Sequence, residues 1–163
     1  MYNVVFESKR MYFVNVEESL VNYYLAMVND KEVQKFLSHE EKVYTLEKEL
    51  AWINKKLEEK ELIFSMIEKE TSEFIGNIEI MSITNNIGLL GIAITRKKQD
   101  RHFGQEALAR MIDFAYNTLN LDGLELNAHG DNYRAIHCYL KVGFVKTGVG
   151  DTPDDIHMRL IRG

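Results

Sequence analysis

Residues 92–108 have the sequence IAITRKKQDRHFGQEAL, in which a β-branched segment is followed by a basic loop and an amphipathic stretch. The pattern predicts a strand ending near Thr95 and a helix over residues 104–119. The first turn of such a helix directs unpaired backbone N–H groups at one point, where an anion is stabilised. A pyrophosphate would suit this place, since its charge would be offset by Lys97, Lys98, Arg101 and His102. From this segment alone, a solvated basic loop is the alternative.

The segments after this helix alternate between strands and helices. Alternating apolar residues predict a strand over 124–128, and helical spacing predicts a helix over 132–142 that ends at Gly143. Residues 144–149 and 156–161 form an expected hairpin around a polar segment. The C-terminal half therefore has the predicted order β-α-β-α-β.

The N-terminal half combines helices with an antiparallel meander. Apolar runs between polar turns predict strands at residues 7–16, 62–68, 74–83 and 87–95. Helical spacing predicts helices at residues 17–28, 30–37 and 45–60, the last capped by Thr45.

Composition bounds the class of protein. The 163 residues carry 20 Lys and Arg against 25 Asp and Glu, a net charge of −5. This length suits one domain over residues 1–163, and the acidic excess disfavours nucleic acid as the main partner. Cys138 is the one cysteine, so a disulfide framework is excluded and a reducing, cytoplasmic location is expected. The longest apolar stretch, residues 87–94, is too short to span a membrane, and no membrane partner is expected.

Residues 130–144, with the sequence GDNYRAIHCYLKVGF, supply a second and independent feature. Together the two segments resemble the GNAT superfamily of acyl-CoA-dependent N-acetyltransferases. Gln99-x-x-His102-x-Gly104 resembles the pyrophosphate loop of that family, and residues 132–144 resemble its second cofactor motif. Upstream, Glu17-Glu18, residues 29–37 and Trp52 are similar to the branch that contains ribosomal-protein N-terminal and spermidine acetyltransferases.

The resemblance implies a fold, a donor and the residues that hold the donor. The expected fold is α/β (α+β), with a mixed, mostly antiparallel sheet of about seven strands and about four helices. The sheet would be splayed between the strand ending near Thr95 and the strand at 124–128, and acetyl-CoA would enter the splay. The acceptor would be a small amine or a peptide N-terminus, and a homodimer is left open. The implied cofactor-binding residues are Ile92, Ala93, Ile94, Gln99, Arg101, His102, Phe103, Gly104, Gln105, Asn132, Ala135 and Lys141.

Direct acetyl transfer to an amine has three requirements, and the resemblance assigns two of them to particular residues. Backbone amides around Ile92–Ile94 would polarise the thioester carbonyl. Tyr139 follows Asn132 by about two helical turns, on the same side of the helix, and would protonate the departing thiolate. An ordinary core aromatic is the alternative for Tyr139.

The third requirement is a neutral amine, which calls for a general base. Relatives often carry a Glu on the strand where this chain has Leu89. Glu79 on the preceding strand is the expected substitute, with Glu125, His129 and Asp131 as further candidates. A structural or solvated role for each carboxylate, or a water chain that carries the proton, is the alternative.

A second departure is His102, where relatives usually have Gly, because a left-handed backbone at another residue costs about 1 kcal/mol or more. We expect either a negative φ at His102 or a phosphate contact from its imidazole. His39, His137 and His157 lack the spacing of metal ligands, so no metal is expected. A protein that binds CoA for sensing or interaction is the alternative function that Leu89 and His102 leave open.

Overall fold

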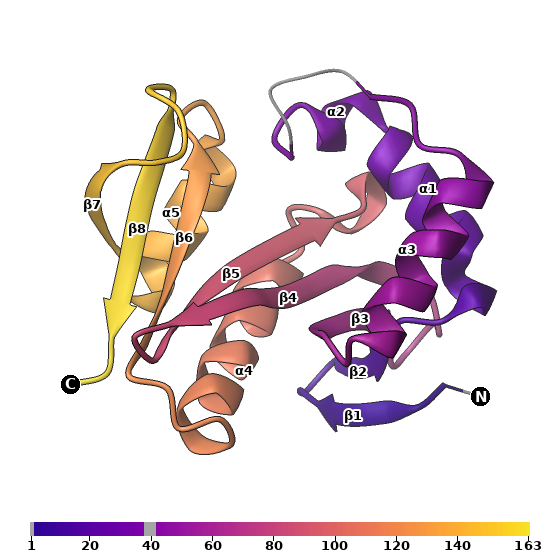
Figure 1. Cartoon of the computed structure of the whole chain (residues 1–163), viewed down its shortest axis with the longest axis horizontal. Helices are drawn as coiled ribbons and strands as arrows, with labels where there is room; N and C mark the ends of the chain where they lie inside the picture. The colour runs from indigo at the N-terminus through magenta and orange to yellow at the C-terminus, as the bar shows by residue number, and fades with distance from the viewer. Residues whose placement is uncertain (1, 38–41) are drawn as a thin grey trace. The chain divides into compact units, whose positions relative to one another are not determined.

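The computed structural model describes residues 2–37 and 42–163, so His39 lies outside the described residues. The chain forms two compact units (Figure 1). The first contains the residues up to 79 together with 92–101, and the second contains 80–91 and 102–163.

Eight strands occur in the described residues, and they join one sheet in the order β1-β2-β3-β4-β5-β6-β8-β7. Their bounds are Val4–Glu7 (β1), Met11–Asn15 (β2), Leu62–Glu68 (β3), Phe74–Thr84 (β4), Ile87–Ile94 (β5), Gly123–His129 (β6), Val145–Val149 (β7) and Asp155–Ile161 (β8). The β1–β2, β2–β3, β6–β8 and β7–β8 pairs are antiparallel, whereas β5–β6 is parallel. The expected mixed, mostly antiparallel sheet is therefore confirmed.

The eighth strand comes from the N-terminus, where the sequence predicts a single strand over residues 7–16. The chain instead turns after Glu7, with Ser8 N donating to Met11 O at 2.9 Å, so that β1 and β2 form a hairpin. Phe6 stacks on Phe13 with 4.6 Å between ring centroids. This cross-strand contact stabilises the pairing of β1 with β2. Phe6 lies before the predicted strand at residues 7–16, so the periodicity of that range could not indicate the contact.

Five α-helices occur among the described residues: Val21–Asn29 (α1), Lys31–Gln34 (α2), Leu46–Glu58 (α3), Phe103–Asn117 (α4) and Tyr133–Val142 (α5). Short 3₁₀ segments cover Glu18–Leu20 and Arg96–Lys98. The predicted cap of α3 is confirmed, since Thr45 Oγ1 accepts from Lys48 N at 3.3 Å. At the end of α5, Gly143 has a φ of 112°, a left-handed conformation that favours glycine.

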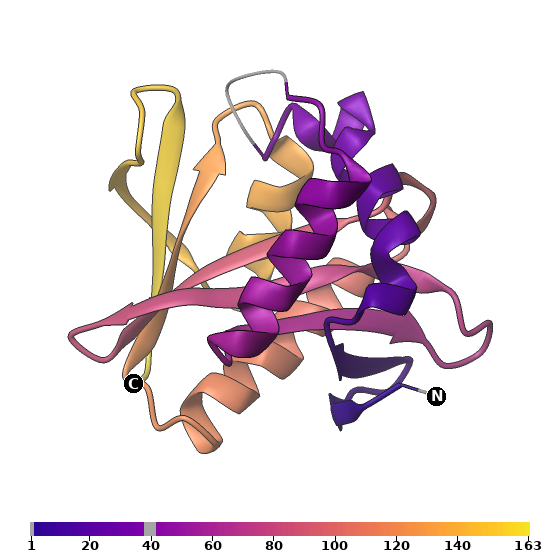
Figure 2. The ribbon, with the colours of Figure 1, turned by 45° about the vertical axis from the view of Figure 1, so that its right-hand side comes forward.

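In the first unit, α1 and α3 lie side by side over strands of the sheet (Figure 2). The core beneath them is apolar, and its buried residues include Val14, Leu20, Tyr24, Met27, Ile53, Ile63, Ile67 and Phe74. Phe74, at the start of β4, packs edge-on against Tyr24 of α1 with 5.5 Å between ring centroids.

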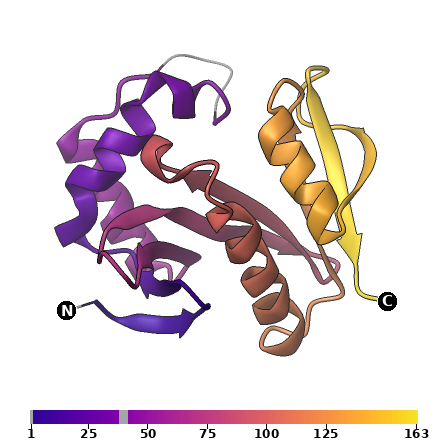
Figure 3. The same cartoon turned by 180° about the vertical axis from the view of Figure 1, so that it is seen from behind.

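In the second unit, α5 lies against β6 and β8 (Figure 3) and contacts α4. Its core contains Phe103, Leu108, Met111, Leu124, Leu126, Phe144 and Met158. Strands β5 and β6 pair at their first residues only, from Ile87–Gly123 to Leu89–Glu125. The parallel ladder between β5 and β6 therefore ends at Leu89 and Glu125.

Candidate active site

The loop between β5 and α4 has a strained backbone. Asp100 and His102 both adopt left-handed conformations, with φ of 60° and 64°. His102 is the N-cap residue of α4, and its side chain makes no capping hydrogen bond. Of the two alternatives expected for His102, a negative φ is therefore wrong, and a phosphate contact from its imidazole stays a prediction. Strain of this kind is held only where the surrounding structure enforces it.

Lys98 was expected among the cations around a bound anion, but the structure uses it differently. Its side chain is buried, and its Nζ lies 2.7 Å from Glu68 Oε1 and 2.9 Å from Glu73 Oε1. Burial acts to lower the pKa of Lys98, but hydrogen bonds to the two carboxylates outweigh it and raise that pKa. The hydrogen bond from Lys98 likewise holds the pKa of Glu68 below its usual range. Lys98 is therefore a structural anchor of the loop.

Other loop residues are tied to the first unit as well. Gln99 Nε2 donates to Ile94 O at 3.0 Å, which fastens the loop to the end of β5. Arg101 lies 3.7 Å from Glu68 Oε2, and its carbonyl accepts from Arg10 at 3.1 Å. These contacts fix the backbone that leads into α4, whose first-turn amides are those of residues 103–105.

Strands β4 and β5 approach each other unusually closely at Gly76. A Cβ atom at this position would lie 2.0 Å from Ala93 O, so the backbone contact requires glycine. Next to it, Thr95 N donates to Ile75 O at 2.9 Å. The segment Ile92–Ile94, expected to polarise the thioester, is thus held in place by β4.

Glu79, the expected general base, lies on β4 beside α3. Its Oε2 is 3.6 Å from Lys56 Nζ, and Lys56 in turn lies over the Trp52 ring at 6.0 Å from the centroid. Burial raises the pKa of Glu79, and the neighbouring Lys56 only partly opposes this. A carboxyl with a raised pKa takes up a proton more readily than an exposed one, which suits a general base.

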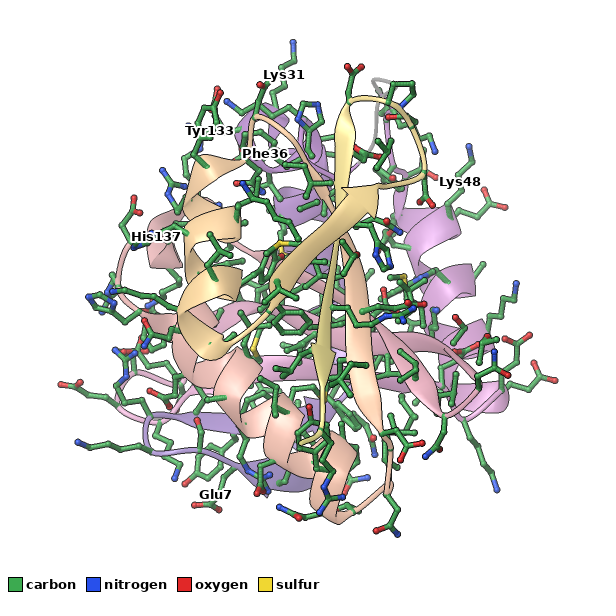
Figure 4. All side chains as sticks on the ribbon, turned by 90° about the vertical axis from the view of Figure 1, so that its left-hand side faces the viewer. Glu7, Lys31, Phe36, Lys48, Tyr133 and His137 are labelled. Atoms are coloured by element: carbon green, nitrogen blue, oxygen red, sulfur yellow. The ribbon has the colours of Figure 1, made fainter. Side chains whose placement is uncertain are left out.

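Helix α5 carries the residues of the second cofactor motif. Asn132 Oδ1 accepts from Ala135 N at 3.4 Å and caps the helix. Tyr139 is buried, with its ring 6.0 Å from that of Phe144, and burial raises the pKa of its phenol. Tyr133 and His137 point outward from α5 (Figure 4), and Lys141 is also exposed. The expected acid is thus the tyrosine that faces the interior of this unit.

Two of the other candidate bases, Glu125 and His129, belong to the second unit and already make hydrogen bonds there. Glu125 Oε2 accepts from Arg159 at 2.9 Å and contacts His157 Nε2 at 3.2 Å. The Arg159 hydrogen bond holds the pKa of Glu125 below its usual range, so this carboxylate is a poorer proton acceptor than Glu79. His129 Nδ1 accepts from Asp131 N at 3.2 Å and stabilises the turn before α5.

Sequence reasoning missed a line of polar side chains in the first unit. Tyr24 of α1 bonds Ser65 of β3, and Ser65 bonds Asn77 of β4. Ser65 sits in a run of six consecutive buried residues, Ile63–Glu68, where a buried hydroxyl is the only local signal. Its partners come from segments distant in the sequence, which no local pattern connects.

The model of a protein family described as "Acetyltransferase (GNAT) domain" matches residues 10–145, more than half of the chain. The chain belongs to the GNAT acetyltransferase family. This confirms the predicted family, whose acetyltransferases use acetyl-CoA as donor.

Three relatives illustrate the likeness. An uncharacterized N-acetyltransferase p20 of Bacillus licheniformis is 31% identical over 88 residues, covering 53% of this chain and 49% of that protein. A spermidine N(1)-acetyltransferase of Vibrio cholerae is 27% identical over 85 residues, covering 51% and 49%. The structure of a Vibrio cholerae spermidine N-acetyltransferase in complex with CoA and spermine has a TM-score of 0.83 at 20% identity and covers 93% of this chain and 95% of that one. The matched region spans about half the length of the two sequence relatives.

Residues 2–37 and 42–163 also lack two further features. No cluster of three or more His, Cys, Asp or Glu side chains there could hold a metal ion. In the same residues, every helix is too short or too polar to cross a lipid bilayer.

Proposed function

We propose that this protein is an N-acetyltransferase that moves acetyl from acetyl-CoA directly to a primary amine of a small molecule or a peptide N-terminus. The observation that carries the proposal is the family match over residues 10–145. The held segment Ile92–Ile94 and the buried Tyr139 support it, because they are chemically suited to the thioester and to the leaving thiolate.

The cofactor roles follow from the family residue by residue. Backbone amides of Ile92, Ala93 and Ile94 would bind the thioester oxygen as it gains charge. The pyrophosphate would be bound by the loop and the start of α4, through Gln99, Arg101, His102, Phe103, Gly104 and Gln105. Asn132, Ala135 and Lys141 of α5 would contact the rest of the cofactor.

Glu79 is the proposed general base, and its raised pKa makes a prediction about pH. The carboxylate accepts a proton only when ionised, so kcat/KM should fall as the pH is lowered through the raised pKa. Glu79→Gln should lower kcat/KM by about 10²-fold and remove this acidic limb. The measurement is a pH profile of wild type, Glu79→Gln and the exposed control Glu59→Gln. An unchanged profile in Glu79→Gln would assign the base elsewhere.

Thiol release from acetyl-CoA over a panel of amines, with isothermal titration of CoA, tests the proposed function. Release that depends on one class of amine supports N-acetyl transfer. CoA binding without amine-dependent release would instead support a sensing or interaction module. Failure to bind CoA would mean that His102 has disabled the pyrophosphate loop and would reject both functions.

A further inference from the structure

The side chains of Tyr24, Ser65 and Asn77 form a hydrogen-bonded chain from α1 through β3 to β4. Each hydroxyl in this chain donates toward Asn77. Ser65 Oγ donates to Asn77 Oδ1 at 2.7 Å and lies 2.5 Å from Tyr24 Oη. Because the one Ser65 proton is given to Asn77, Tyr24 must donate to Ser65. Burial raises the pKa of Tyr24 to about 12, so it keeps its proton at neutral pH. The backbone N–H of Glu17 completes the chain by donating to Tyr24 at 3.4 Å.

This chain fixes which end of the Asn77 carboxamide is presented outward. With Oδ1 occupied by Ser65, the two N–H groups on Nδ2 form the outer end. Asn77 is half-buried, and Tyr116 Oη is the one fully buried side-chain polar atom of the described residues that lacks a partner. The Asn77 N–H groups are therefore open to solvent and available to a ligand.

Asn77 also adjoins the backbone expected to polarise the thioester. It directly follows Gly76, whose missing Cβ would overlap Ala93 O at 2.0 Å. Its side chain lies on the side of β4 that faces α1 and α3, because it bonds Ser65, the partner of Tyr24, and because Glu79, two residues further along β4, lies 3.6 Å from Lys56 of α3. Asn77 thus directly follows the residue that abuts Ala93, and its side chain lies on the α1 side of the sheet.

We propose that Asn77 determines acceptor specificity by donating a hydrogen bond to an oxygen adjacent to the reacting amine. This inference rests on the proposed function. The favoured acceptors are amines with a neighbouring carbonyl or hydroxyl oxygen, such as amino-acid amides and amino alcohols. A polyamine has no such oxygen and would leave the Asn77 donors unpaired when it displaces water. A site built to bond a substrate oxygen discriminates strongly against analogues that lack it.

The test compares glycinamide, ethanolamine, propylamine and spermidine as acceptors for wild type, Asn77→Ala and Asn77→Asp. Each acceptor is compared with itself across variants, so differences in amine pKa cancel. Asn77→Ala should lower kcat/KM about tenfold for glycinamide and ethanolamine, and leave it within about twofold for propylamine and spermidine. Asn77→Asp keeps the acceptor for Ser65 but loses the donors, so it should reverse the preference toward spermidine. Asn54→Ala, on the exposed side of α3, is the matched control.

Two results would overturn the inference while acetyl transfer itself stands. One is an equal loss of kcat/KM for all four acceptors in Asn77→Ala, while Asn77→Asp keeps the unfolding temperature of wild type. The other is a wild-type preference for spermidine that neither variant alters. Absence of thiol release with every amine would instead reject the proposed function, and this inference with it.

Discussion

Tyr139→Phe should lower kcat for acetyl transfer by about 10²- to 10³-fold, the range typical of a lost general acid. The phenol is buried against Phe144, and its raised pKa keeps it protonated throughout the neutral range, so its proton is available to the departing thiolate. Phe keeps the ring and its packing, so the dissociation constant of CoA should stay within about twofold. Steady-state kinetics and isothermal titration measure the two quantities.

Tyr133→Phe is the matched control, because Tyr133 lies on the same helix with 74% of its surface exposed. It should leave both kcat and CoA affinity unchanged. Equal kcat values for Tyr139→Phe and wild type would reduce Tyr139 to a core aromatic.

Lys98→Met should destabilise the protein by about 3 kcal/mol, because it removes the cation hydrogen-bonded to the buried Glu68 and leaves that carboxylate only the more distant Arg101, at 3.7 Å. For a chain of this size, that corresponds to an unfolding midpoint lower by roughly 6 to 12 °C. The Michaelis constant for acetyl-CoA should also rise, since Lys98 anchors the loop that carries Gln99 and Arg101. Thermal unfolding and steady-state kinetics check the two effects.

A double variant tests whether the loss of stability in Lys98→Met comes from the unpaired charge of Glu68. Glu68→Met with Lys98→Met removes both charges and should recover most of the lost stability, because the unpaired buried carboxylate is gone. Glu73→Gln should cost far less, because the Glu73 side chain is 59% exposed. An unfolding midpoint of Lys98→Met equal to that of wild type would contradict the buried role of Lys98.

The pH dependence of the stability that the Lys98–Glu68 ion pair contributes follows from the directions of the two pKa shifts. The pKa of Glu68 is lowered in the folded state, so its stabilisation is present above its usual pKa and is lost as the pH falls through the lowered value. The pKa of Lys98 is raised, so its stabilisation is present at neutral pH and is lost as the pH rises through the raised value. The anchor is therefore complete across the neutral range.

Local signals predicted much of the fold. Thr45 and Asn132 cap the helices for which their side chains are suited, and Gly143 ends α5 in the left-handed conformation. Asn85 and Asn86, with φ of 52° and 63°, form the turn between β4 and β5, where the sequence predicts a polar turn between two strands. Each of these depends on residues within a few positions along the chain, which is why sequence patterns contain them.

Contacts between distant segments account for what was missed. The run of basic residues suggested an exposed loop, yet Lys98 is buried, with Glu68 at the end of β3 and Glu73 just before β4 bonded to it. The Tyr24, Ser65 and Asn77 chain likewise joins three elements, and neither partner of Ser65 is near it in sequence. Pairings of this kind depend on sheet register and helix packing rather than on local periodicity.

Transfer of a labelled acetyl group tests direct acetylation most directly. The protein is mixed with isotopically labelled acetyl-CoA and an accepted amine, and both the amine and the intact protein are weighed by mass spectrometry. We predict that the label appears on the amine in step with thiol release, while the mass of the protein, including its one cysteine at Cys138, stays unchanged. Thiol release without labelled amine, or label retained on the protein as an intermediate, would contradict direct transfer.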